Sequence, residues 1–207
     1  MNQREKQAHW DKAYAAKSTT SQSWYRPHLE ISLALIRRAA PDLSTPVIDI
    51  GAGESTLLED LIAGGYTHLS ALDISPQALQ HLRTRLGPAS NRMSWHCGDI
   101  LTIPLRQAYF GLWHDRAVFH FLTSPAVRAA YVNQAASALR PGGHVILATF
   151  APNGPTQCSG LPVMRHDANS ILHEFGPRFR LEATATELHT TPAGATQPFI
   201  YCDLTLR

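Results

Sequence analysis

The feature that most constrains the fold is the alternation of apolar runs with helix signals after residue 45. Apolar runs at residues 46–50, 68–74, 92–100, 109–115 and 144–150 predict five strands. Helical spacing at residues 55–65, 75–86 and 124–139 separates most of them, and two of these helices open with Ser-Pro, which is typical of a helix start. Alternation of this kind predicts an α/β fold with a doubly wound, parallel sheet.

The end of the chain departs from this alternation. After a helix predicted at residues 167–175, two further strands are expected at 179–189 and 198–206. The short segment between them contains no helix, so the two strands can pair only in the antiparallel direction. We therefore predict a mostly parallel, Rossmann-like sheet of seven strands with one antiparallel strand near the edge.

Two regions are predicted along the chain. Residues 1–44 form an N-terminal helical cap segment, with helices at 5–16 and 28–39 joined by a polar loop at 17–23. Residues 45–207 form the main α/β domain.

Composition excludes several classes of protein. The net charge is +2 without a long basic run, which argues against a nucleic-acid surface. No apolar run is long enough to span a bilayer and no signal peptide is visible, so we expect a cytoplasmic protein without a membrane partner. The three cysteines are far apart and the histidines are scattered, so we expect no metal site.

A glycine turn follows the first strand. Gly51 and Gly53 come directly after Ile50, where glycine leaves room for a ligand against the backbone. The second strand ends at Asp73, whose carboxylate suits both hydroxyls of a ribose, and the third ends at Asp99, which suits an adenine amine. Because the carboxyl ends of parallel strands meet at one edge, these acids are predicted to border one cleft.

The charge around the turn distinguishes two nucleotide cofactors. The dinucleotide-binding motif G-x-G-x-x-G requires a third glycine at position 56, where this chain has Thr56. Asp49 and Glu54 flank the turn and would repel a pyrophosphate. S-adenosylmethionine carries a sulfonium and an ammonium group instead, so acids near the turn favour it.

Four stretches together resemble a known family: VIDIGAGES, ALDIS, CGDI and LRPGGHVILATF. They are similar to the motifs of class I S-adenosylmethionine-dependent methyltransferases, and the resemblance covers roughly residues 45–150. It implies transfer of a methyl group, with S-adenosylhomocysteine as the product of the cofactor. One departure is Ser55, where many members have a third glycine.

The resemblance also implies positions for the cofactor. Asp49, Gly51 and Gly53 would border the methionine part. Asp73, with Ile74 beside it, would hold the ribose. Asp99 and Ile100 would meet the adenine.

The opening of the chain carries a second resemblance. HWDKAY and SWYRPHLE are similar to the start of small methyltransferases that include lysine methyltransferases of the elongation-factor type. In those relatives the segment covers the cofactor, so Trp24, Tyr25 and Arg26 would close the site, with Arg26 at the methionine carboxylate. The alternative is an amphipathic helix with aromatic core residues.

The fourth strand end is expected to face the methyl group. Asp115 and His120 are the candidates for a general base or an acceptor-binding group, and Asp115 is also counted among the cofactor contacts. The alternatives are an ion pair for Asp115 and a structural histidine at a helix start.

The methyl acceptor is predicted to be a small molecule, because the chain is short and residues 151–166 form a lid-like irregular segment. Cys158 and Cys202 could serve a thiol or metalloid acceptor, or simply be buried. The alternatives are a protein lysine as the acceptor, a non-catalytic domain that binds the cofactor, and a nicotinamide oxidoreductase.

Overall fold

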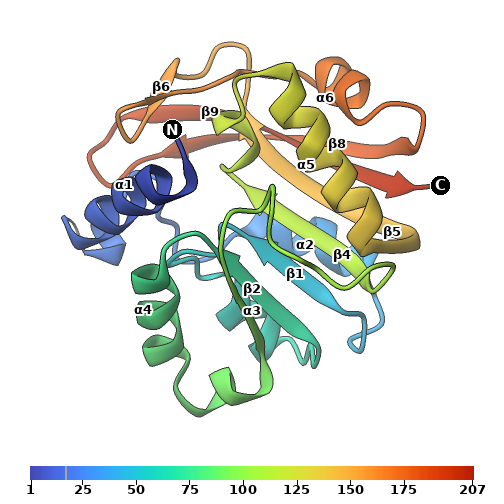
Figure 1. Cartoon of the computed structure of the whole chain (residues 1–207), viewed down its shortest axis with the longest axis horizontal. Helices are drawn as coiled ribbons and strands as arrows, with labels where there is room; N and C mark the ends of the chain where they lie inside the picture. Colours follow the sequence, from blue (N-terminus) through green and yellow to red (C-terminus); the bar gives the residue numbers. More distant parts are fainter. Residues whose placement is uncertain (17) are drawn as a thin grey trace.

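The computed structural model describes residues 1–16 and 18–207, so Lys17, the first residue of the predicted loop at 17–23, lies outside the described residues. Seven strands form one sheet in the order β3-β2-β1-β4-β5-β9-β8 (Figure 1). Five of them are parallel: β1 (Val47–Ile50), β2 (Leu69–Asp73), β3 (Ser94–Cys97), β4 (Phe110–Arg116) and β5 (Leu139–Phe150).

The last two strands form a long hairpin at one side of the sheet. β9 (Thr196–Leu206) pairs antiparallel with β5 and with β8 (Phe179–Thr190), so β9 is the one reversed strand and lies next to the edge. The predicted sheet of seven strands with one antiparallel member is confirmed.

Helices cover both faces of this sheet. One face carries α2 (Glu30–Ala39), α3 (Leu57–Ala63) and α4 (Pro76–Leu86), and the other carries α5 (Pro125–Ala138) and α6 (Ala168–Phe175). The N-terminal helix α1 (Gln3–Ala15) lies at the end of the sheet, beside α4 (Figure 1). Short 3-10 turns complete the chain: η1 (Thr19–Ser21), η2 (Gly87–Arg92) and η3 (Phe119–Phe121).

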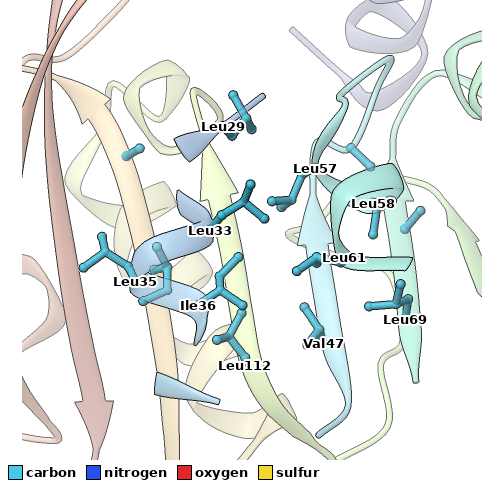
Figure 2. Close-up of a cluster of buried hydrophobic side chains, with 14 of the residues drawn as sticks. Leu29, Leu33, Leu35, Ile36, Val47, Leu57, Leu58, Leu61, Leu69 and Leu112 are labelled. Carbon is cyan, nitrogen blue, oxygen red and sulfur yellow. The ribbon is translucent and has the colours of Figure 1, made fainter. Parts of the chain in front are cut away.

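The strands alternate their side chains between two cores, one on each face. Val47 and Leu112 point toward α2 and α3, while Ile48 and Trp113 point toward α5. Figure 2 shows the leucines of α2 and α3 gathered over β1 and β4. Burying a leucine contributes roughly 1.5–3 kcal/mol, so these layers fix the helices on the sheet and the strand ends in space.

The two Ser-Pro starts behave as predicted. The Ser75 side chain accepts a hydrogen bond from the Ala78 backbone, and Ser124 accepts one from Val127 in the same way. Both helices therefore begin directly after a strand or loop at the edge where the predicted site lies.

The structure differs from the prediction at two places. The fifth strand was predicted at 144–150, but it begins at Leu139, which pairs with Phe110 directly after α5 ends at Ala138. The register then shifts and regular pairing resumes at His144; Gly142 takes a left-handed φ of 74° within this irregularity. The segment 151–166, predicted to be irregular, also contains a small hairpin of β6 (Gln157–Cys158) and β7 (Leu161–Pro162).

Among the described helices, none is long and apolar enough to cross a membrane.

Candidate active site

The turn after β1 requires glycine for two reasons. Gly51 and Gly53 have φ values of 64° and 48°, in the left-handed region. A Cβ on Gly51 would lie 2.2 Å from Val118 Cγ2, and one on Gly53 would lie 2.2 Å from the Tyr14 hydroxyl oxygen. The turn is therefore a close-fitting floor made of main chain, as the sequence predicted.

Asp73 joins this turn to the end of β2. One carboxylate oxygen accepts a hydrogen bond from the Gly53 backbone at 2.8 Å, and the other accepts one from the Ser75 backbone at 2.8 Å. The side chain is buried, and burial raises the pKa of Asp73 to about 7 although these backbone bonds act to lower it. The carboxylate keeps free lone pairs for a further donor such as a hydroxyl.

Asp99 follows β3 at the same edge. Its carboxylate accepts from Lys6 Nζ at 2.7 Å and from the Leu101 backbone at 3.1 Å. Ile74 and Ile100 line the cavity next to these acids. The predicted acids of the second and third strands therefore do border one cavity.

This cavity has a volume of about 460 Å³ and runs along the carboxyl ends of four strands. The sheet order β3-β2-β1-β4 places Asp99 and Asp73 at one end, Gly51 in the middle and Arg116 at the other end. Beyond Arg116 the wall is built from η3, the start of α5 and the β6–β7 hairpin.

Helix α1 covers the cavity with one face. Lys6, Trp10 and Tyr14 line it, and their spacing of four residues places them on a single helical stripe. Trp10 meets the rings of Trp24 at 6.2 Å and Phe121 at 5.1 Å, both edge to face. The resemblance of HWDKAY predicted a cover in this segment, but these three residues were not singled out from the sequence; the spacing of Trp10 and Tyr14 was the available signal.

A second, smaller cavity of about 40 Å³ lies on the other side of the glycine turn. Asp49 and Glu54 line it and are buried. One oxygen of Asp49 lies 2.6 Å from His114 Nδ1, and one oxygen of Glu54 lies 2.6 Å from His81 Nδ1. The other oxygen of each has no hydrogen-bond partner among the described residues. Two unsatisfied carboxylate oxygens at one small cavity suit a cation.

Trp24, Tyr25 and Arg26 all border this smaller cavity, and Trp24 borders the larger one as well. Arg26 makes ion pairs with Glu187 at 3.1 Å and with Glu30 at 3.8 Å. The sequence prediction that this triplet lies at the site therefore agrees with its position, and the contact of Arg26 with a carboxylate ligand stays a prediction.

Asp115 occupies a buried position behind the cavity. One oxygen accepts from the Val118 and Phe119 backbones at 2.9 and 3.4 Å, and the other accepts from the Tyr131 hydroxyl. Burial raises the pKa of Asp115 to about 6, against the effect of these donors. These bonds hold the turn after β4, so the geometry favours a positioning role, and a catalytic or cofactor contact stays a prediction.

His120 is fully buried between aromatic rings. Its ring lies 4.5 Å from the rings of both Phe121 and Phe150, and neither nitrogen has a hydrogen-bond partner in the described part of the chain. Burial, with a smaller contribution from the Arg116 charge, lowers the pKa of His120 to about 3. The ring does not line either cavity described above, and its catalytic role stays a prediction.

The site as a whole suits one kind of cofactor. A long cavity with acids at the ends of β2 and β3 fits a nucleoside, a glycine floor allows close approach, and unsatisfied acid oxygens fit a cationic amino acid end. The strand order and this acid-rimmed turn agree with the fold implied by the resemblance to class I methyltransferases.

Comparisons with known proteins agree. Residues 47–143 match the model of a methyltransferase domain family. The eEF1A lysine and N-terminal methyltransferase of Mus musculus is 24% identical over 213 residues; the match covers 94% of this chain and 30% of that protein. The chain thus spans about a third of the length of this relative.

Solved structures show the same fold. A methyltransferase from Anabaena variabilis superposes with a TM-score of 0.74 and 16% identity, covering 100% of this chain and 96% of that one. The N-methyltransferase NodS from Bradyrhizobium japonicum, in complex with S-adenosylhomocysteine, gives a TM-score of 0.71 and 14% identity, covering 95% and 96%. Residues 47–143 thus match a methyltransferase domain and the whole chain has the fold of these enzymes, which supports a class I S-adenosylmethionine-dependent methyltransferase with S-adenosylhomocysteine as the product of its cofactor.

Proposed function

We propose that the enzyme methylates a small molecule. The observation that carries this proposal is the apolar far end of the 460 Å³ cavity, where Phe121, Leu161 and Pro162 line the space beyond the glycine turn. An acceptor held there would contact mostly apolar side chains, as small ligands usually do. When bound, S-adenosylmethionine supplies an electrophilic methyl group on its sulfonium.

The protein's own residues would then divide the work of holding the cofactor. Asp73 accepts the ribose hydroxyls, with Ile74 beside it, and Asp99 accepts the adenine amine next to Ile100. This assignment is supported by their positions at adjacent strand ends of one cavity.

The methionine end belongs to the smaller cavity in this proposal. Asp49 accepts from the ammonium group with its unpartnered oxygen, and the carboxylate meets Arg26. Trp24 and Tyr25 cover this end. The backbone of Gly51 and Gly53 forms the floor between the two parts.

A labelling experiment tests the acceptor class. The purified protein is incubated with methyl-labelled S-adenosylmethionine and a cell extract, and label is measured separately in precipitated protein and in the low-molecular-mass filtrate. We expect label in the filtrate. An Asp73→Ala variant is expected to lose it, while Asp42→Asn, a change in an exposed loop before β1, is expected to keep it.

A protein lysine is the second candidate for the acceptor. It is favoured by the relative that is named as a lysine and N-terminal methyltransferase. Label in precipitated protein and none in the filtrate would support it. Tight binding of the cofactor with no label in either fraction would instead support a non-catalytic domain.

A further inference from the structure

The far end of the larger cavity has an unusual chemical character. We call it the acceptor chamber and define it by Arg116, Phe121, Leu122, Val127, Cys158 and Leu161. All of its members except Arg116 and Cys158 are hydrocarbon. Two hydroxyls, of Thr123 and Ser124, lie at its border, and Ser124 caps α5 by accepting from the Val127 backbone.

Among the described residues, the chamber contains no carboxylate or imidazole that could remove a proton. Among the described residues that line the cavity, the carboxylates are Asp73 and Asp99, both at the opposite end, and no histidine is present. Asp115 and His120 are buried outside the cavity. A general base must come within hydrogen-bond reach of the proton that it takes, and none of these does so in the chamber.

Arg116 is the one charged side chain of the chamber in the described part of the chain. Its Nη1 donates to the Trp24 carbonyl at 2.9 Å and its Nε donates to the Tyr201 hydroxyl at 3.2 Å. The side chain is only 6% exposed, and its guanidinium lies over the Phe199 ring at 4.7 Å. Nη2 is buried, makes no hydrogen bond with any described residue and forms an ion pair with Glu187 at 3.7 Å. Because Glu187 also pairs with Arg26, one carboxylate faces two guanidinium groups, and the excess positive charge at this wall of the cavity suits an anion.

We propose that the acceptor is a small apolar molecule with an already ionised nucleophile, a thiolate or a carboxylate, and that Arg116 is its counter-charge. This inference rests on the proposed function, since it assumes a small acceptor. The nucleophile's lone pair forms a bond to the methyl carbon while the carbon–sulfur bond breaks and its electrons pass to sulfur. The products are a neutral thioether or methyl ester and S-adenosylhomocysteine, and no proton has to be removed.

Ordinary acidities show why the lack of a base matters. At pH 7 a thiol with a pKa of about 8.5 is roughly 3% ionised, a phenol near 10 about 0.1%, and an amine near 10.4 is deprotonated to about 0.04%. A carboxylate is fully ionised. Without a base, a thiol therefore has about a 30-fold advantage over a phenol, and a nearby arginine increases the ionised fraction of a thiol further.

Two other groups at the cavity are poor competitors for the methyl group. Burial raises the pKa of the Cys158 thiol, which keeps it neutral. Burial and the neighbouring Asp73 charge raise the pKa of Tyr14 well above its ordinary value, so its hydroxyl also stays protonated. The ionised nucleophile is therefore expected to come from the acceptor.

Four probes of similar shape test this proposal: benzenethiol, benzoate, phenol and benzylamine. Each is incubated with the enzyme and S-adenosylmethionine, and the methylated product is measured by mass spectrometry from pH 7 to pH 9. We expect benzenethiol or benzoate to be methylated at least about 30-fold faster than phenol and benzylamine at pH 7. The rate with benzoate should be nearly independent of pH, because a carboxylate is fully ionised from pH 7 to pH 9, whereas the rate with phenol should rise with pH. Turnover of benzenethiol alone assigns a sulfur acceptor, and turnover of benzoate alone assigns a carboxylate.

The contrary outcomes separate this inference from the proposed function. Equal or faster methylation of phenol or benzylamine would overturn the inference and leave a small acceptor in place. If no probe reacts while the extract filtrate takes up label, the inference is likewise overturned and the acceptor is still a small molecule. Label confined to precipitated protein would overturn both.

Arg116 is tested by calorimetry, which does not depend on turnover. In the complex with S-adenosylhomocysteine, Arg116→Gln is expected to weaken benzoate binding about tenfold or more, and Arg116→Lys to restore part of it. Arg106→Gln, at an exposed position, is the matched control. If Arg116→Gln or Arg116→Lys weakens S-adenosylhomocysteine binding but not benzoate binding, Arg116 serves the cofactor and the proposal fails.

Discussion

Asp73 allows the sharpest test of the cofactor site, because its pKa lies near neutral pH. Burial raises it to about 7, so the side chain is about 90% ionised at pH 8 and about 10% ionised at pH 6. If the carboxylate is the form that accepts the ribose hydroxyls, affinity for S-adenosylhomocysteine falls about tenfold from pH 8 to pH 6, or about 1.4 kcal/mol.

An Asp73→Asn variant separates this effect from titration of the ligand itself. It should bind S-adenosylhomocysteine about 10- to 100-fold more weakly at pH 8, because a hydrogen bond to a charged group contributes about 1.5–3 kcal/mol. Its affinity should also lose the part of the pH dependence that belongs to Asp73. Asp42→Asn, in the exposed loop before β1, should behave as the wild type does.

Calorimetry at pH 6, 7 and 8 measures these affinities, and thermal unfolding checks the fold. The sign of the stability effect is opposite to that of binding. An acid whose pKa is raised in the folded state stabilises it below the ordinary pKa and loses that contribution as the pH rises through about 7. The contribution of Asp73 therefore makes the fold no less stable at pH 6 than at pH 8. Equal affinities for wild type and Asp73→Asn at all three pH values would refute the ribose assignment.

Three further changes test the surrounding structure. Gly53→Ala places a Cβ 2.2 Å from the Tyr14 hydroxyl oxygen, so we expect a lower melting temperature and weaker cofactor binding. Tyr131→Phe removes a hydrogen-bond donor to the buried Asp115 carboxylate and should lower the free energy of unfolding by about 1–3 kcal/mol at pH 8. This loss should be smaller at pH 5, because the pKa of Asp115 is about 6 and its side chain is then protonated. His120→Leu removes two buried nitrogens that have no partner among the described residues, so the variant should be more stable in denaturant unfolding. If the folded variant loses turnover, that result would support the catalytic role predicted from the sequence.

Much of the site could be predicted because the relevant residues follow the ends of parallel strands. Gly51, Gly53, Asp73 and Asp99 lie at one edge as a direct consequence of the alternating pattern. The cover formed by α1 could not be predicted in the same way. Which face of a terminal helix packs on a distant cavity depends on long-range contacts, such as the bond from Ser75 Oγ to Asp11.

The direction of side chains on β4 was also harder to predict than the strand itself. His114 pairs in register with Asp49 and points toward the same face, where it contacts that acid. Asp115 pairs with Ile50 and points to the opposite face, where Tyr131 of α5 donates to it. A period of two assigns adjacent residues to opposite faces, but which face opens on the cavity is decided by the turn that follows the strand.

Charge around the glycine turn explains why this sheet suits a sulfonium cofactor better than a dinucleotide. Asp49 and Glu54 each keep one buried oxygen without a partner among the described residues, at the place where a Rossmann dinucleotide site holds its pyrophosphate. Two unit charges 4 Å apart interact by about 4 kcal/mol at an effective dielectric constant near 20. Each acid would therefore stabilise a bound ammonium or sulfonium and destabilise a bound phosphate by a similar amount.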